Sequence, residues 1–164
     1  MKFINYNKDV LFIDEVSISN PSDRQLQIKV FSSGINRADI LQKKGLYPSP
    51  KGESEIIGLE CSGVVEKVGH SVQNFQIGDR VCAILGGGGY AEFVNVDERQ
   101  VMPVPSNIDL HHAGALPETI LTVYENIFNI SQFKENETVL IHGGSSGIGT
   151  TASSILKNYT ENIY

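Results

Sequence analysis

The sequence has no long hydrophobic run and no cluster of basic residues. Nowhere among its 164 residues do about 18 apolar residues follow one another, so no transmembrane helix is expected. The first residues alternate apolar and polar side chains, unlike the apolar centre of a signal peptide. Lys and Arg number 13 against 19 Asp and Glu, and the net charge of −6 argues against a nucleic-acid surface. We therefore expect neither a membrane nor a nucleic acid as a partner.

Cysteine is also scarce. The chain has 2 cysteines, Cys61 and Cys82, and neither lies in a CxxC pair or near a histidine at ligand spacing. This scarcity argues against a disulfide framework and against a structural zinc lobe. We expect both thiols to be buried and reduced. With 40% hydrophobic and 20% charged residues, the composition is that of an ordinary soluble globular protein, which we expect to be cytoplasmic.

Short strands dominate the first two thirds of the chain. Residues 3–19 predict two strands, and residues 25–31 alternate as a strand with one buried face. Residues 37–44 predict a short helix with Asn36 as its N-cap. Further strands are expected within residues 56–69, 75–83 and 90–96. Many short strands at close spacing indicate a compact β-barrel-like domain.

The pattern changes after residue 105. Residues 109–130 are predicted to be largely helical, with Asp109 as an N-cap and a break or fresh helix start at Pro117. The sequence therefore predicts two domains, residues 1–112 and residues 113–164.

A glycine-rich turn follows the apolar, β-branched residues 139–142 and leads into a predicted helix. Such a strand, turn and helix present backbone N–H groups to a pyrophosphate. A P-loop is excluded, because position 150 is Thr and not the required Lys. A relative of GxGxxG fits if Ser146 replaces a glycine. A turn that needs small residues for packing alone is the remaining alternative.

A GxxxGxG reading uses Gly143, Gly147 and Gly149 and resembles the cofactor loop of short-chain dehydrogenases. Those enzymes carry the loop near the start of the chain, whereas 138 residues precede the predicted strand here. Too few residues follow the loop to hold the catalytic Tyr and Lys of that family. The position of the loop therefore argues against a short-chain dehydrogenase.

Several upstream motifs carry a resemblance that covers nearly the whole chain. They are NRAD (36–39), GLYP (45–48), GLECSGVV (58–65), IGDRV (77–81), GGYAE (88–92), PE with LT (117–118 and 121–122), and the glycine loop. In this order they resemble the medium-chain dehydrogenases/reductases, and specifically the zinc-free, zeta-crystallin-like quinone oxidoreductases. The likeness is greatest to the p53-inducible quinone oxidoreductase branch.

The resemblance implies a mixed α and β fold. A GroES-like β-barrel catalytic domain would be followed by the first strand and helix of a Rossmann domain. It also implies NADPH as cofactor, hydride transfer from the nicotinamide to a quinone or an activated alkene, and homodimers among full-length members. By resemblance the substrate would lie against Asn36 and Tyr47. The cofactor would lie against Asn36, Thr122, Gly144, Ser146, Gly147, Ile148 and Gly149.

No metal ligand and no catalytic acid, base or nucleophile is predicted. Zinc-dependent members of the superfamily place Cys at the position of Asn36 and His at the position of Leu59. Asn is a poor zinc ligand and Leu is none, and Glu60 alone cannot hold the metal. We expect Glu60 to be a structural hydrogen-bonding group. The sequence after the loop shows no convincing acidic residue for the ribose and no Lys or Arg for a 2′-phosphate, so it does not distinguish NAD from NADP.

The resemblance implies a cofactor domain that continues for well over a hundred residues beyond the glycine loop. Residues 158–164 are polar and do not read as the next buried parallel strand. Two kinds of function stay open. The chain is the N-terminal part of a quinone reductase, or of an enone or alkenal reductase of the same superfamily. Alternatively, it is a shortened, non-catalytic relative that acts as a folded binding module.

We predict that the purified 164-residue chain alone shows no NADPH-dependent reduction of ortho- or para-quinones, because most adenosine contacts of the cofactor would be missing. The measurement is the loss of NADPH absorbance in the presence of a quinone. Steady turnover by the monomeric chain would contradict the prediction.

Overall fold

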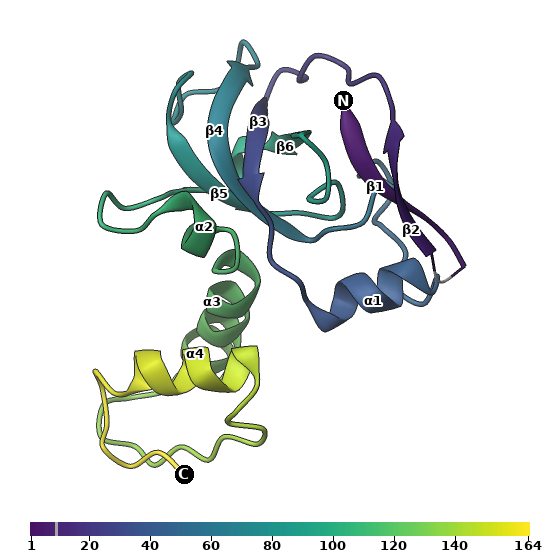
Figure 1. Cartoon of the computed structure of the whole chain (residues 1–164). Helices are drawn as coiled ribbons and strands as arrows, with labels where there is room; N and C mark the ends of the chain where they lie inside the picture. The colour runs from purple at the N-terminus through teal and green to yellow at the C-terminus, as the bar shows by residue number, and fades with distance from the viewer. Residues whose placement is uncertain (9) are drawn as a thin grey trace. The chain divides into compact units, whose positions relative to one another are not determined.

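The chain forms two compact units (Figure 1). The computed structural model describes residues 1–8 and 10–164, and the units span Met1–Pro117 and Glu118–Tyr164. No helix within the described residues is long and apolar enough to span a bilayer.

The first unit is built on antiparallel strands, as the sequence predicts. They are β1 (Lys2–Asn7), β2 (Val10–Glu15), β3 (Gln25–Ser32), β4 (Glu60–Val68), β5 (Arg80–Ile84), β6 (Phe93–Asp97) and β7 (Val101–Pro103). β1 and β2 form a hairpin, and the other strands form one sheet in the order β6-β3-β4-β5-β7. Figure 1 shows this sheet curling into a half-barrel, with the hairpin beside it. The predicted mixed α and β architecture, with a β-barrel-like first unit, is confirmed.

The core lies on the inner face of the curled sheet. Alternate residues of neighbouring strands supply it: Leu26, Ile28, Cys61, Val65, Val81, Ala83, Val94 and Val96. Burying one Leu or Ile side chain contributes about 2 kcal/mol, so these residues hold the half-barrel together.

The prediction that β3 buries only one face is wrong near the start of the strand, at Gln27. Gln27 points away from the core and is nevertheless only 3% exposed. Its amide donates hydrogen bonds to the backbone carbonyl of Ser19 (3.2 Å) and to Oδ1 of Asn95 (3.1 Å). The chain before β3 covers this face, which a pattern of alternation alone does not reveal.

The one glycine of β4, Gly63, allows close approach to neighbouring backbone, as the glycine-punctuated strand predicts. An ideal Cβ placed on Gly63 would lie 2.1 Å from the carbonyl oxygen of Lys29 on β3. Any side chain at this position would push β3 and β4 apart.

The predicted helix boundaries are confirmed. The helices are α1 (Arg37–Lys43), η1 (Glu98–Gln100), α2 (Leu110–Ala113), α3 (Pro117–Val123), the π-helix η2 (Tyr124–Ile130) and α4 (Gly147–Leu156). Asn36 is the N-cap of α1, and the side chain of Asp109 caps α2 by accepting a hydrogen bond from the backbone N–H of His112 (2.9 Å). Pro117 is the first residue of α3, where its missing N–H costs no helical hydrogen bond.

The prediction of a strand at residues 139–142 is wrong: the segments before and after α4 are joined by backbone hydrogen bonds but are not strands. The N–H of Val139 donates to Asn162 (2.9 Å), that of Ile141 to Tyr164 (2.7 Å), and that of Tyr164 back to Val139 (2.9 Å). These bonds make one isolated parallel bridge, between Val139 and Ile163. Residues 158–164 contain no strand and are mostly exposed, so the prediction that they do not form the next buried parallel strand is confirmed.

Both cysteines are free and buried, as predicted. They lie on the neighbouring strands β4 and β5, where Cys61 is opposite Ala83 and Cys82 is opposite Ser62. Burial raises the pKa of the Cys61 thiol to about 12 and that of the Cys82 thiol to about 11. Neither thiol is ionised near neutral pH, so neither is a nucleophile in the folded chain.

We predict that the folded chain resists Ellman's reagent at about pH 8, whereas the chain unfolded in guanidinium reacts with both thiols. Raised pKa values and burial keep the reactive thiolate away from the reagent until the β4–β5 pair opens. Rapid modification under native conditions would contradict this prediction.

Candidate functional site

Asn36 lies at the start of α1, beside a buried carboxylate. Its side-chain Nδ2 donates a hydrogen bond of 2.7 Å to Oε1 of Glu60, the first residue of β4. Glu60 is only 1% exposed, whereas Asn36 is half-buried. The prediction that Glu60 is a hydrogen-bonding group is confirmed.

A second buried carboxylate fixes the backbone around Asn36. Asp39 is 3% exposed and accepts hydrogen bonds from the backbone N–H of Asn36 (2.7 Å), the backbone N–H of Leu59 (3.1 Å) and the hydroxyl of Tyr90 (2.9 Å). Asp39 thus ties the first turn of α1 to the start of β4 and to the loop before β6.

Tyr90 completes this network. Its hydroxyl also lies 3.1 Å from the backbone carbonyl of Gly34, so its single proton is shared between this carbonyl and Asp39. Burial, together with the nearby charge of Asp39, raises the pKa of the Tyr90 hydroxyl far above its usual range. Tyr90 therefore stays protonated at neutral pH and acts as a donor.

The residues around Asn36 do not fit the zinc site of the zinc-dependent members of the superfamily. Leu59, which stands where zinc-dependent members carry His, is buried and apolar. Asn36 uses its amide for Glu60. Among residues 1–8 and 10–164 no group of three or more His, Cys, Asp and Glu side chains lies together as a metal site. The donors present do not suit zinc.

Tyr47 lines a different part of the first unit. It lies in the loop after α1, is 47% exposed, and borders a pocket of about 260 Å³. Tyr6, Gln42 and Glu55 border the same pocket, but Asn36 does not. Gln42 is buried, and its amide donates to Oγ of Ser49 (3.0 Å), which also borders the pocket. The structure therefore does not bring the two predicted substrate residues into one pocket.

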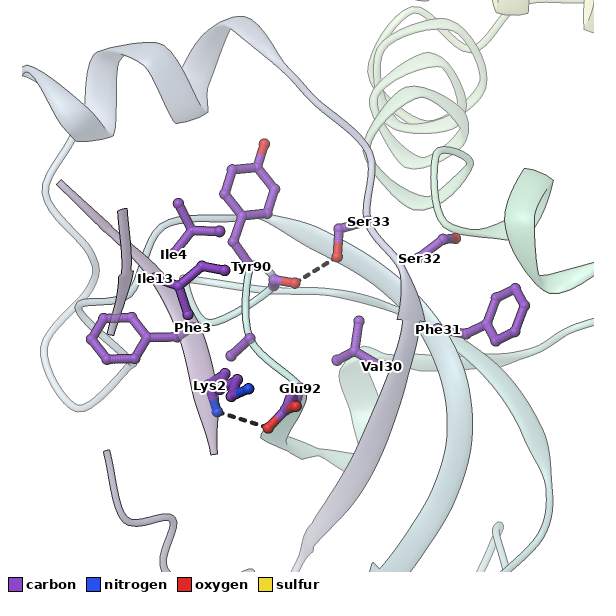
Figure 2. A pocket seen from close by; sticks show the side chains of 12 residues that line it. Lys2, Phe3, Ile4, Ile13, Val30, Phe31, Ser32, Ser33, Tyr90 and Glu92 are labelled. Atoms are coloured by element: carbon purple, nitrogen blue, oxygen red, sulfur yellow. Dashed lines mark hydrogen bonds between the residues drawn. The ribbon is translucent and has the colours of Figure 1, made fainter. Parts of the chain in front are cut away.

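An apolar groove of the first unit also lies away from the predicted residues. It measures about 400 Å³ and lies between β1, the end of β3 and residues 89–92. Figure 2 shows apolar side chains along it, with polar contacts at its ends, where Ser33 Oγ donates to the carbonyl of Gly89 (2.5 Å) and the N–H of Lys2 donates to Glu92 (2.7 Å). Its 12 lining residues include none of the predicted site residues.

In the second unit, the glycine loop forms the N-terminus of α4. Ser146 is the N-cap, and its Oγ accepts a hydrogen bond from the backbone N–H of Gly149 (3.0 Å). The N–H of Ser146 closes the preceding turn on the carbonyl of Gly143 (2.9 Å), which has a φ of 74°. Residues 144–148 are exposed, so the turn presents its backbone to solvent.

The glycines of the loop have different steric roles. An ideal Cβ on Gly149 would lie 2.4 Å from the carbonyl oxygen of Gly143, so only glycine fits there. A Cβ on Gly144 would meet nothing within 4 Å, and one on Gly147 would meet only Thr119 Cγ2 at 3.6 Å. Packing therefore requires Gly149 but leaves the small size of Gly144 and Gly147 unexplained.

Thr122 lies in α3, where its backbone carbonyl accepts a hydrogen bond from the side chain of Asn126 (2.8 Å). Its predicted role at the cofactor stays a prediction, as do the roles of Ile148 and the loop glycines. Sequence reasoning missed Tyr90 and Asp39 as the residues that organise the site. Both occur in the motifs that carry the resemblance, but only the fold brings them together.

Comparison with known proteins identifies the family. Residues 22–106 match the alcohol dehydrogenase GroES-like domain. This match covers more than half of the chain, so the chain belongs to that family, within the medium-chain dehydrogenases/reductases.

Individual relatives extend the likeness into the second unit. The synaptic vesicle membrane protein VAT-1 homolog-like of Mus musculus is 31% identical over 145 residues, which are 88% of this chain and 35% of that protein. A quinone oxidoreductase of Pseudomonas syringae is 29% identical with a TM-score of 0.83, over 96% of this chain and 50% of that chain. The CurK enoyl reductase has the same fold, with a TM-score of 0.89 and 24% identity over 99% of this chain and 53% of that one. The chain thus spans about a third to a half of these relatives.

We predict that alanine destabilises the fold at one loop glycine and has little effect at another. Gly149→Ala lowers the free energy of unfolding by about 1–3 kcal/mol, because its Cβ overlaps the Gly143 carbonyl. Gly147→Ala changes it by less than about 0.5 kcal/mol, because its Cβ has room. The measurement is urea unfolding followed through the amide resonances of α4. Equal losses in both variants would contradict this assignment of roles.

Proposed function

We propose that this chain provides the catalytic domain and the pyrophosphate loop of an NADPH-dependent reductase, which transfers a hydride to a quinone or an activated alkene. The observation that carries the proposal is the glycine loop at α4. It has small residues where packing does not require them, in a chain that belongs to the alcohol dehydrogenase GroES-like family.

The start of α4 is suited to a pyrophosphate. The first N–H groups of a helix have no intrahelical acceptor, and the helix dipole favours an anion there. Gly147 and Ile148 are the first residues of α4, and both are exposed. Without a Cβ, Gly144 and Gly147 let a phosphate approach the backbone closely.

A bound nicotinamide would supply the hydride, and the chain's own residues would orient the substrate. Asn36 holds a polar group by hydrogen bonding, and Tyr47 offers an exposed ring on which a flat quinone can stack. The donor set around Asn36 and Leu59 supports a reaction without zinc. The proposal includes three further parts: NADPH rather than NADH as the cofactor, the cytoplasm as the compartment, and homodimers of full-length members. These parts rest on the resemblance and on the reduced thiols.

Titration of the ¹⁵N-labelled chain by NMR tests the proposal without requiring turnover. Millimolar NADPH is expected to shift the amide resonances of Gly147 and Ile148. Menadione is expected to shift those of Asn36 and Tyr47. The Gly147→Val variant should keep its fold and lose the NADPH response, because its side chain covers the exposed backbone at which the phosphate would bind.

The controls separate the alternatives. trans-3-Penten-2-one in place of menadione tests for an enone substrate at the same residues. Shifts from neither acceptor, together with no NADPH response at the loop, would contradict the proposal and favour a non-catalytic binding module. An NADPH response that survives in Gly147→Val would contradict the assigned role of the loop.

A further inference from the structure

The bond between Asn36 and Glu60 is a buried contact between a neutral amide and a carboxylate. Hydrogen bonds to a charged group are shorter and about twice as strong as neutral ones, and the 2.7 Å separation of Asn36 Nδ2 and Glu60 Oε1 agrees with this. A single bond of this kind orients a planar amide, because it decides in which direction the NH₂ end points.

The fold leaves the Glu60 carboxylate little freedom. An ideal Cβ on Gly34 would lie 2.0 Å from Oε1 of Glu60, so the absence of a side chain at Gly34 makes room for the carboxylate. The carbonyl of Gly34 is itself held by the Tyr90 hydroxyl. Glu60 is thus fixed by β4 on one side and by the loop before α1 on the other.

The backbone of Asn36 is held independently of its side chain. Asp39 accepts the Asn36 N–H, and Tyr90 and Leu59 donate to the same carboxylate. The Asn36 side chain takes part in the capping box with the backbone of Asp39, and the Glu60 contact holds its NH₂ end.

We propose that Glu60 is a positioning residue: its carboxylate orients the Asn36 amide toward the substrate. This inference rests on the proposed function, in which Asn36 contacts the substrate. Glu60 does not touch the substrate and acts through Asn36. A buried carboxylate therefore stands beside the position at which zinc-dependent members carry a metal ligand, and holds an amide in place instead of a metal.

The test compares the chain with its Glu60→Gln and Glu60→Ala variants, with menadione as the probe. Glu60→Ala should raise the dissociation constant for menadione about tenfold, read from the Asn36 resonances, because loss of a charge-assisted bond frees the amide. Glu60→Gln keeps an acceptor oxygen and should restore part of the affinity. In the unliganded chain, both variants should move the Asn36 side-chain NH₂ resonances.

A second buried carboxylate provides the matched control. Glu98, the first residue of η1, is 5% exposed, accepts from the N–H of Gln73 (3.2 Å) and lies 3.6 Å from Arg24. Glu98→Gln should lower the free energy of unfolding by as much as Glu60→Gln does and leave menadione affinity unchanged. If Glu60→Ala does not fold, the Glu60→Gln variant carries the comparison.

The outcomes distinguish this inference from the proposed function. Unchanged menadione affinity in the folded Glu60 variants, with the normal response in the unsubstituted chain, would overturn the positioning role alone. Absence of any menadione response at Asn36 in the unsubstituted chain would overturn the proposed function and this inference with it. Equal weakening in Glu98→Gln would show a general effect of stability and would also overturn it.

Discussion

Two buried carboxylates, Asp39 and Glu60, hold the first unit's candidate site together. Burying a carboxylate is unfavourable unless donors satisfy it, and this requirement brings α1, β4 and the loop before β6 to one point. Asp39 takes three donors from these segments, and Glu60 takes the Asn36 amide. The curled sheet supplies the apolar core, but these polar contacts decide where the first turn of α1 lies relative to the sheet.

The same constraint explains what the sequence could predict. Alternation of apolar residues located β3, and cap chemistry located the starts of α1 and α2, because both signals are local. The partners of Asp39 are far away along the chain: Tyr90 lies 51 residues later. No periodicity links residues at that separation, so the network became visible only in the folded chain. The buried Gln27 was missed for the same reason, since its partners Ser19 and Asn95 come from other segments.

The segment before the glycine loop shows another limit of sequence patterns. Residues 139–142 have the apolar, β-branched pattern of a strand, but they form no strand and make only an isolated parallel bridge, between Val139 and Ile163. Thr160 adds a side-chain contact to this bridge, because its hydroxyl donates to the carbonyl of Glu137 (2.9 Å), just before residue 139. A polar residue thus helps to hold the C-terminal segment beside residues 137–139, although neither segment is a strand.

The glycine loop was ambiguous in sequence because several motifs share small residues at nearby spacings. The structure shows which of these small residues packing requires and which it does not. Gly149 is needed by the fold itself, since any side chain there would overlap the Gly143 carbonyl. Gly147 and Gly144 have room for a methyl group, so the stability of the loop gives no reason for their size. These glycines lie at the exposed start of a helix, where packing does not require their small size. A ligand that approaches the backbone from solvent would explain it. This distinction supports a pyrophosphate-binding loop over a simple packing turn.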